Sequence, residues 1–249
     1  MSTILAVTIG IVVVVLLVLH FANPSNKFDI NQISAQTLLT AAINTFLRLF
    51  AAYVLSLVFS IPLALLIVCT PRVQGVLLPV SDVLQSIPVL AFFPVVIVFF
   101  TASHQFEAAA IFIIFIAMMW NIVFTVIGGL QTIPKDVQSA ALVFNVFGIR
   151  KFWYITLPAI FPFLVTGSLL AWAQGWTTVI VAEVLHTYIP NGKLSQDLLG
   201  LGSLLVDSSA QGKHAVFAAT LGIMILLITL INVLVWQRLL HLAQRFKFD

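Results

Sequence analysis

Residues Ala108–Leu130 read AAAIFIIFIAMMWNIVFTVIGGL, a largely apolar stretch of 23 positions without a charged side chain. An α-helix rises 1.5 Å per residue, so a helix over this stretch would be about 35 Å long. The hydrocarbon core of a bilayer is about 30 Å thick. The stretch therefore predicts a transmembrane helix.

The composition of the whole chain agrees with a membrane protein. Of the 249 residues, 61% are hydrophobic and 8% are charged, whereas about 25% are charged in soluble domains. Cys69 is the single cysteine, which excludes an intrachain disulfide and a metal cluster held by thiols. The net charge of +3 comes without a stripe of Lys and Arg, so no nucleic-acid partner is expected.

Five further stretches are long and apolar enough to cross a bilayer. They are Ser2–Phe21, part of Leu49–Cys69, Asp82–Thr101, Ile160–Leu185 and Ala215–Gln237. We therefore expect an all-α membrane protein of about six transmembrane helices, with residues 1–249 forming a single transmembrane domain. The first stretch could also be a signal peptide, but it lacks a basic n-region, which favours a retained helix.

The distribution of basic residues predicts the orientation. If the amino terminus is cytoplasmic, the inner loops and tail carry seven Lys and Arg residues and the outer side carries at most four. The positive-inside rule favours this arrangement, in which both termini are cytoplasmic. Residues 1–38 then hold the first helix and an outer segment, with Phe28–Phe46 extending the second helix at the interface. Residues 39–239 form the core, and His186–His214 is an external loop.

The third span contains three prolines, Pro79, Pro88 and Pro94. Each removes a backbone donor and bends a helix. A kinked structural helix is one interpretation of this pattern. A helix that is broken where it lines a translocation path is the other.

The segment Gln131–Pro158 connects the fourth and fifth spans on the cytoplasmic side, and it predicts two short helices. Asn145 and Gly148 tolerate a left-handed break between them. The second helix is expected to start near Arg150 and to end before Pro158. Two short amphipathic helices at a right angle would form a compact projection from the membrane.

This segment resembles the permease subunits of ATP-binding-cassette (ABC) importers. Their signature is Glu-Ala-Ala, three residues, Gly, nine residues, Ile, one residue and Leu-Pro. The spacing is met in full here, and five of the seven positions match; Ser139 replaces the Glu and Asn145 replaces the Gly. Leu84–Ala91 and Trp176–Glu183 are similar to segments of the nitrate, sulfonate and taurine importers and of duplicated anion permeases. The likeness covers roughly 39–239.

The resemblance implies a type I importer permease in a bacterial inner (plasma) membrane, surrounded by lipid. The two-helix segment would couple to an ATPase subunit. The residues expected in this contact are Ser139, Ala140, Ala141, Asn145, Gly148, Leu157 and Pro158. The implied partners are a second permease subunit, identical or different, two ATPase subunits and an external substrate-binding protein. The chain has no GxxxxGK[ST] phosphate loop, so it is not expected to be an enzyme or to bind a cofactor. ATP and Mg would be bound by the ATPase.

A cargo path is expected along the fifth span. Ser168, Trp172, Trp176 and Glu183 fall on one stripe of a helix, with Gly175 beside it to allow another helix to approach. Packing and interfacial placement are the alternative interpretations, since Glu183 is expected at the outer membrane boundary. We also assign to the path Asn121 on the fourth span and Ser86 on the third.

The resemblance implies a small anion, such as nitrate or a sulfonate, as the cargo. We find no Lys or Arg near a bilayer midplane, so the anion would be bound by hydroxyl, amide or indole groups. Two other classes remain open. An ion-coupled transporter or channel would need ionisable residues inside the bundle. An intramembrane hydrolase would need a His or Asp beside Ser168.

Overall fold

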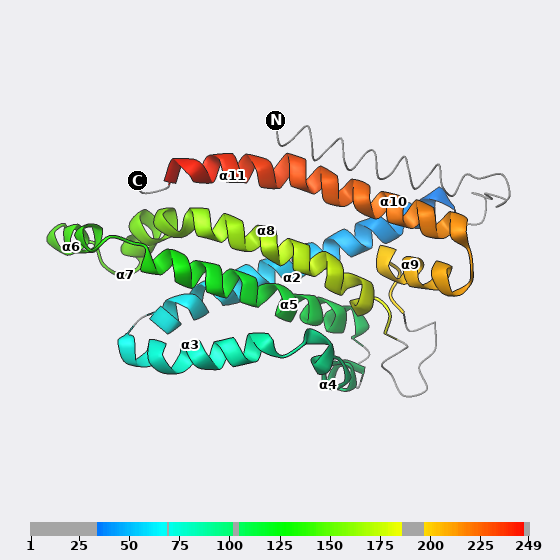
Figure 1. The fold of residues 1–249 in the computed structure, drawn as a ribbon, viewed down its shortest axis with the longest axis horizontal. Helices are drawn as coiled ribbons and strands as arrows, with labels where there is room; N and C mark the ends of the chain where they lie inside the picture. The colour runs from blue at the N-terminus through cyan, green and yellow to red at the C-terminus, as the bar shows by residue number, and fades with distance from the viewer. Residues whose placement is uncertain (1–33, 69, 102–104, 186–196, 247–249) are drawn as a thin grey trace.

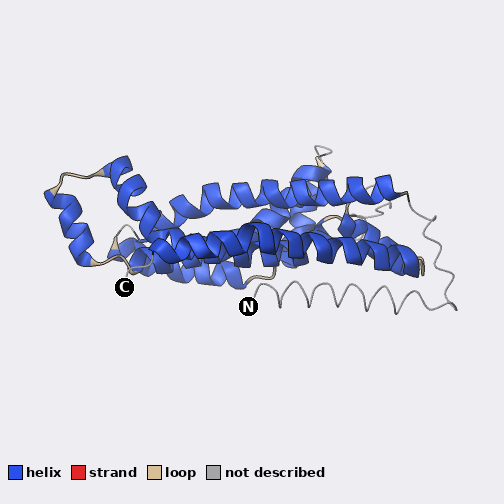
Figure 2. Cartoon of the chain, turned by 90° about the horizontal axis from the view of Figure 1, so that it is seen from above, coloured by secondary structure: helices blue, strands red, loops and turns tan. Residues whose placement is uncertain are grey.

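Long helices run roughly parallel to one axis of the molecule (Figure 1). The computed structural model describes residues 34–68, 70–101, 105–185 and 197–246. These residues form helices and connecting loops, without a strand among them (Figure 2). The helices are α2 (Ala35–Val68), α3 (Pro71–Ser86), α4 (Val89–Thr101), α5 (Phe106–Gln131), α6 (Lys135–Val143), α7 (Gly148–Lys151), α8 (Leu157–Ala182), α9 (Leu201–Ala210), α10 (His214–Ile231) and α11 (Gln237–Ala243).

Four helical segments are long and apolar enough to cross a membrane. They are Ala35–Val68, Phe106–Gln131, Gly148–Ala182 and His214–Phe246, and the bent pair α3–α4 makes up to five. Four of the expected spans are thereby confirmed as continuous helices. The expected span Ser2–Phe21 lies outside the described residues, so the total of six remains a prediction.

Helix α2 is longer than a single span requires. Its 34 residues extend about 51 Å at 1.5 Å per residue. From Ala35 to Phe46 the helix is continuous with the membrane-spanning part, which agrees with the expected extension of the second span. Its placement at the outer interface remains a prediction.

The third span is broken within the expected range Asp82–Thr101, as in the second interpretation, and its role in lining a path remains a prediction. The helix begins at Pro71, where the Thr70 hydroxyl caps it by accepting a hydrogen bond from the Val73 amide at 3.3 Å. It ends at Ser86, and α4 starts at Val89 after a bend of 85°. Ile87 is extended because the ring of the following Pro88 disfavours the helical conformation at that position. The structure therefore contains a broken helix rather than a kinked one.

The second helix of the segment 131–158 does not end before Pro158, so that expectation is wrong. Helix α7 continues through a π-helical turn, Phe152–Thr156, into α8. In this turn the Leu157 amide donates to the Phe152 carbonyl, five residues back. A π-turn widens the helix locally and is a recognised site of helix irregularity. We attribute the tolerance of Pro158, which has no amide hydrogen, to this wider turn.

Glycines allow α5 and α8 to pack closely. A Cβ atom on Gly167 would overlap the Thr125 hydroxyl, and one on Gly175 would overlap the Met118 methyl group and lie 3.0 Å from Leu49 Cδ2. The expected close approach at Gly175 is therefore confirmed. Around this contact the core is filled by aliphatic and aromatic side chains of α2, α5 and α8.

We predict that Gly167→Ala destabilises the folded protein, because its methyl group would overfill the α5–α8 contact. Overpacking of this kind costs about 1–3 kcal/mol. Gly222→Ala is the matched control, since a Cβ atom there meets nothing within 4 Å. Thermal unfolding of both variants in detergent tests the prediction. Equal melting temperatures for the two variants would contradict it.

Candidate functional site

The segment from α6 to α7 projects from one end of the helical bundle (Figure 2). Asn145 has φ 53° and Gly148 has φ 58°, so both adopt the expected left-handed conformation. The Val146 amide donates to the Ala141 carbonyl at 2.8 Å and closes the end of α6. The sequence thus places a residue that tolerates positive φ at each side of the turn.

The small residues of this segment do not share one exposed face. Ser139 and Ala140 are exposed, whereas Ala141 is 3% exposed and contacts the rest of its own chain. Consecutive residues of a helix point about 100° apart, which separates the two alanines. A partner can therefore reach Ala140 directly, whereas Ala141 packs inside the segment, and the part of both residues in coupling remains a prediction. Leu157 and Pro158 are half-buried at the base of the segment.

Large apolar side chains cover the outside of the segment. Each of seven residues is more than half exposed, and together we call them the apolar knob surface: Leu142, Val143, Phe144, Phe147, Ile149, Trp153 and Tyr154. A gathering of exposed apolar side chains on one short segment is typical of a site of contact with protein or membrane.

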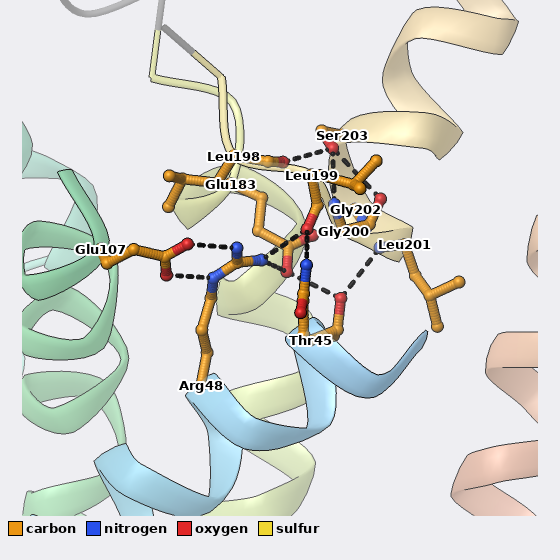
Figure 3. Close-up of polar contacts among 11 residues, drawn as sticks. Thr45, Arg48, Glu107, Glu183, Leu198, Leu199, Gly200, Leu201, Gly202 and Ser203 are labelled. Carbon is orange, nitrogen blue, oxygen red and sulfur yellow. Dashed lines mark hydrogen bonds and ion pairs between the residues drawn. The ribbon is translucent and has the colours of Figure 1, made fainter. Parts of the chain in front are cut away.

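A buried ionic network lies at the opposite end of the bundle, near α9 (Figures 1 and 3). Glu183 follows the last residue of α8 and is 0% exposed. Its carboxylate is therefore not exposed to solvent, and its position at the outer membrane boundary remains a prediction. The chain segment from Leu198 to Gly202 covers Glu183, and the Leu198 amide donates to the Glu183 carbonyl at 3.0 Å.

Three groups donate hydrogen bonds to the Glu183 carboxylate (Figure 3). Thr45 Oγ1 and Arg48 Nη1 bind Oε1 at 2.7 and 2.8 Å, and the Gly202 amide binds Oε2 at 2.7 Å. A buried carboxylate is stable only when it is paired and hydrogen-bonded in this way.

Arg48 connects Glu183 to a second carboxylate, that of Glu107 in the first turn of α5. Its Nε and Nη2 atoms bind Glu107 Oε2 and Oε1 at 2.6 and 2.7 Å, and Nη1 also donates to the Leu199 carbonyl at 3.1 Å. The Arg48 side chain is 4% exposed and that of Glu107 is 59% exposed. One cation therefore joins a buried anion to a partly exposed one.

Two glycines allow the covering segment to approach Glu183. A Cβ atom on Gly200 would overlap the Glu183 carboxylate, and one on Gly202 would lie 2.6 Å from the Ile180 Cα atom. In the sequence these glycines only interrupt helix-like spacing in Leu194–Val206. The signal that could have found the site is this pair of glycines together with an Arg and a Glu at the outer ends of two spans.

The stripe on α8 is buried within the chain. Ser168 accepts a hydrogen bond from the Tyr53 hydroxyl at 2.8 Å. The ring of Trp172 lies 5.7 Å from Tyr53 and 6.2 Å from Trp236. Trp176 is 7% exposed. These contacts fit the packing interpretation, and a role in a cargo path remains a prediction.

The other two residues assigned to the path lie on other helices. Asn121 of α5 is half-buried, and its amide donates to the Ala117 carbonyl at 3.4 Å. Ser86 is exposed at the end of α3, beside the break, and donates to the Asp82 carbonyl at 2.8 Å. Among the described residues, neither side chain makes a hydrogen bond to the stripe on α8.

One known protein family matches most of the chain. The family model described as "Binding-protein-dependent transport system inner membrane component" matches residues 56–241. This range includes the broken third span, the α6–α7 segment and Glu183.

Three relatives carry names that describe permeases. The nitrate import permease protein NrtB of Leptolyngbya laminosa is 31% identical over 156 residues, which are 63% of this chain and 55% of the relative. The bicarbonate transport system permease protein CmpB of Synechococcus elongatus is 27% identical over 164 residues, 66% and 55% of the two chains. The taurine transport system permease protein TauC of Escherichia coli is 25% identical over 138 residues, 55% and 49%. The chain thus spans about half the length of the curated relatives it matches.

We predict that Glu183→Gln lowers the stability of the protein strongly, because it leaves the buried Arg48 with one carboxylate fewer. Removing one partner of a buried ion pair costs about 3–5 kcal/mol. Glu107→Gln is the matched control and should cost less, since the Glu107 side chain is 59% exposed and a Gln there stays hydrated. Detergent unfolding curves of the two variants give the comparison. A smaller loss for Glu183→Gln than for Glu107→Gln would refute the assignment of the buried anchor.

Proposed function

We propose, because this chain belongs to the family of binding-protein-dependent transport system inner membrane components, that it is the permease subunit of an ABC importer. The chain forms part of the substrate path across the membrane. A separate subunit hydrolyses ATP and binds the ATP and Mg. The α6–α7 segment receives the movement of that subunit.

The observation that carries the proposal is the apolar knob surface at the end of a rigid segment. The segment has the spacing of the family signature, a left-handed turn at Asn145 and exposed aromatic side chains such as Phe144 and Trp153. Aromatic residues are enriched in protein–protein interfaces and often contribute most to binding. The ATPase subunit is the partner that fits this surface.

The path requires a second permease subunit. Trp172, Trp176 and Ser168 are buried against their own chain, so the described residues of one chain leave little free surface along this stripe. The bent pair α3–α4 presents a broad exposed apolar face, which includes Val76, Val83, Val95, Val98 and Phe99. Part of this face contacts lipid and part contacts the second permease. Two ATPase subunits and an external substrate-binding protein complete the importer.

The cargo is a small anion. The names of the relatives specify nitrate, bicarbonate and taurine, and each of these molecules presents oxygen atoms that carry negative charge. A compact group of this kind is recognised by charge-assisted hydrogen bonds.

An ion-coupled transporter is the alternative, and the buried Arg48 and Glu183 are the observation in its favour. These residues neutralise each other, and Glu183 receives three hydrogen bonds in all. Glu183 is therefore not a free carrier site in this conformation. Transport that continues without an ATPase subunit would support the alternative.

The orientation gives a labelling prediction. The α6–α7 segment should be cytoplasmic and α9 external, with both termini cytoplasmic, because the basic residues are concentrated on the α6 side. In a Cys69→Ser background, a membrane-impermeant thiol reagent added outside should label Gln211→Cys and not Ser139→Cys. Both positions are exposed on the protein surface. The result therefore depends only on which side of the membrane each cysteine faces. The opposite labelling pattern would invert the orientation.

The docking prediction compares two glutamates introduced on the knob. Phe144→Glu should abolish co-purification of the ATPase subunit, because Phe144 is 77% exposed and the change buries a charge in the contact. Ser139→Glu, an exposed position where the family signature has Glu, should retain it. ATPase activity bound to the tagged chain in membranes is the measurement. Full retention of the ATPase by Phe144→Glu would sink the proposal of an ABC permease.

A further inference from the structure

Arg48 is a buried cation that holds two carboxylates of different character (Figure 3). It uses Nη1 for Glu183 and the Leu199 carbonyl, and it uses Nε and Nη2 together for Glu107. The two sides of the guanidinium therefore bind different carboxylates.

The side toward Glu183 is permanent. Glu183 is fully buried and also accepts hydrogen bonds from Thr45 and the Gly202 amide. Its surroundings are closed by Gly200 and Gly202, where a larger residue would overlap neighbouring atoms. Displacing this carboxylate would leave a buried Arg and several donors without partners, which is strongly unfavourable. Glu183 thus fixes the position and orientation of Arg48.

The side toward Glu107 is exchangeable. The Glu107 side chain is 59% exposed, and among the described residues its carboxylate binds Arg48 alone. Glu107 can rotate outward into water, and the buried Nε and Nη2 groups of Arg48 then require another acceptor. It lies in the first turn of α5, where the helix dipole favours negative charge whether Glu107 or another anion supplies it.

We propose that Arg48 is an oxyanion-recognition residue at the outer end of the bundle, and that Glu107 occupies its binding fork until an anionic cargo replaces it. This inference rests on the proposed function as an importer of small anions. It assigns a protein contact to that cargo, in a region where the sequence alone indicates no cation for the path.

An oxyanion that replaces Glu107 would keep both the hydrogen-bond geometry and the charge of the site. The Glu107 carboxylate meets two parallel N–H groups with two oxygen atoms at 2.6 and 2.7 Å. Nitrate and bicarbonate are planar and present the same pair of oxygens, and a sulfonate presents two of its three. Arg48, Glu107 and Glu183 together carry a net charge of −1. Replacement of one monovalent anion by another on the same fork leaves the charge of the site unchanged.

The fork, rather than the charge alone, makes the site selective. An arginine binds a planar oxyanion through two N–H groups in a fixed geometry, whereas a lysine supplies a single point charge. Chloride has one centre and cannot occupy both donors with separate oxygens. The site should therefore prefer nitrate to chloride, and it should lose this preference when Arg48 is replaced by Lys.

The test measures nitrate binding to the purified full-length chain in detergent by isothermal titration calorimetry, with sodium chloride keeping the ionic strength constant. Glu107→Gln removes the internal competitor, so we expect its nitrate Kd to be about tenfold or more below that of the natural chain. The matched double variant, Arg48→Lys with Glu107→Gln, should lose this gain. Equal nitrate affinity in the natural chain, Glu107→Gln and the double variant would overturn the inference.

A more conservative variant tests the inference if Glu107→Gln or the double variant fails to fold. Glu107→Asp keeps the charge but shortens the side chain, which weakens its contact with Arg48, and its nitrate affinity should fall between those of the natural chain and Glu107→Gln. Absence of any gain in Glu107→Asp as well would overturn the inference. A chain that still binds the ATPase subunit through the knob but shows no nitrate response would refute this inference alone and leave the permease function intact.

Discussion

The buried pair of Arg48 and Glu183 is the interaction on which the α9 end of the molecule depends. Ionised groups without partners are too costly to bury, so this pair determines which segments must meet. It brings α2 to the end of α8, draws the segment 198–202 over both, and through Glu107 includes the start of α5. The glycines at 200 and 202 follow from this requirement, because any larger residue would displace the covering segment from the carboxylate.

The two ends of the bundle therefore achieve order by different means. At the α9 end, polar groups are buried and satisfied by one another, which specifies a single arrangement. At the other end, large apolar side chains such as Phe144 and Trp153 remain exposed, and the backbone itself supplies rigidity through the turn at Asn145. Such a surface is incomplete in the isolated chain. We interpret this asymmetry as follows. One end is stabilised by contacts within the chain, and the exposed apolar side chains of the other end are buried by a partner.

Much of the helical framework could be predicted from the sequence, because hydropathy over about 20 residues is a local property. Ala108–Leu130 differs from α5 by two residues at its start and one at its end. The left-handed turn at Asn145 was also predictable from residue type. Arg48 and Glu183 are 135 positions apart, and no local pattern indicates that such residues meet. The continuation of the helix past Pro158 depends on a π-turn, which residue preferences do not specify.

The π-turn also determines how the two ends of the protein are connected mechanically. Since the helix is unbroken from Gly148 to Ala182, a rod of 35 residues, about 52 Å long, leads from the apolar knob surface to the residue before Glu183. A hinge at Pro158 would have absorbed a tilt of the knob locally. Without that break, the two ends are joined by one continuous run of backbone hydrogen bonds, which includes the π-turn. Arg48 of α2 meets the far end of this continuous helix through its ion pair with Glu183.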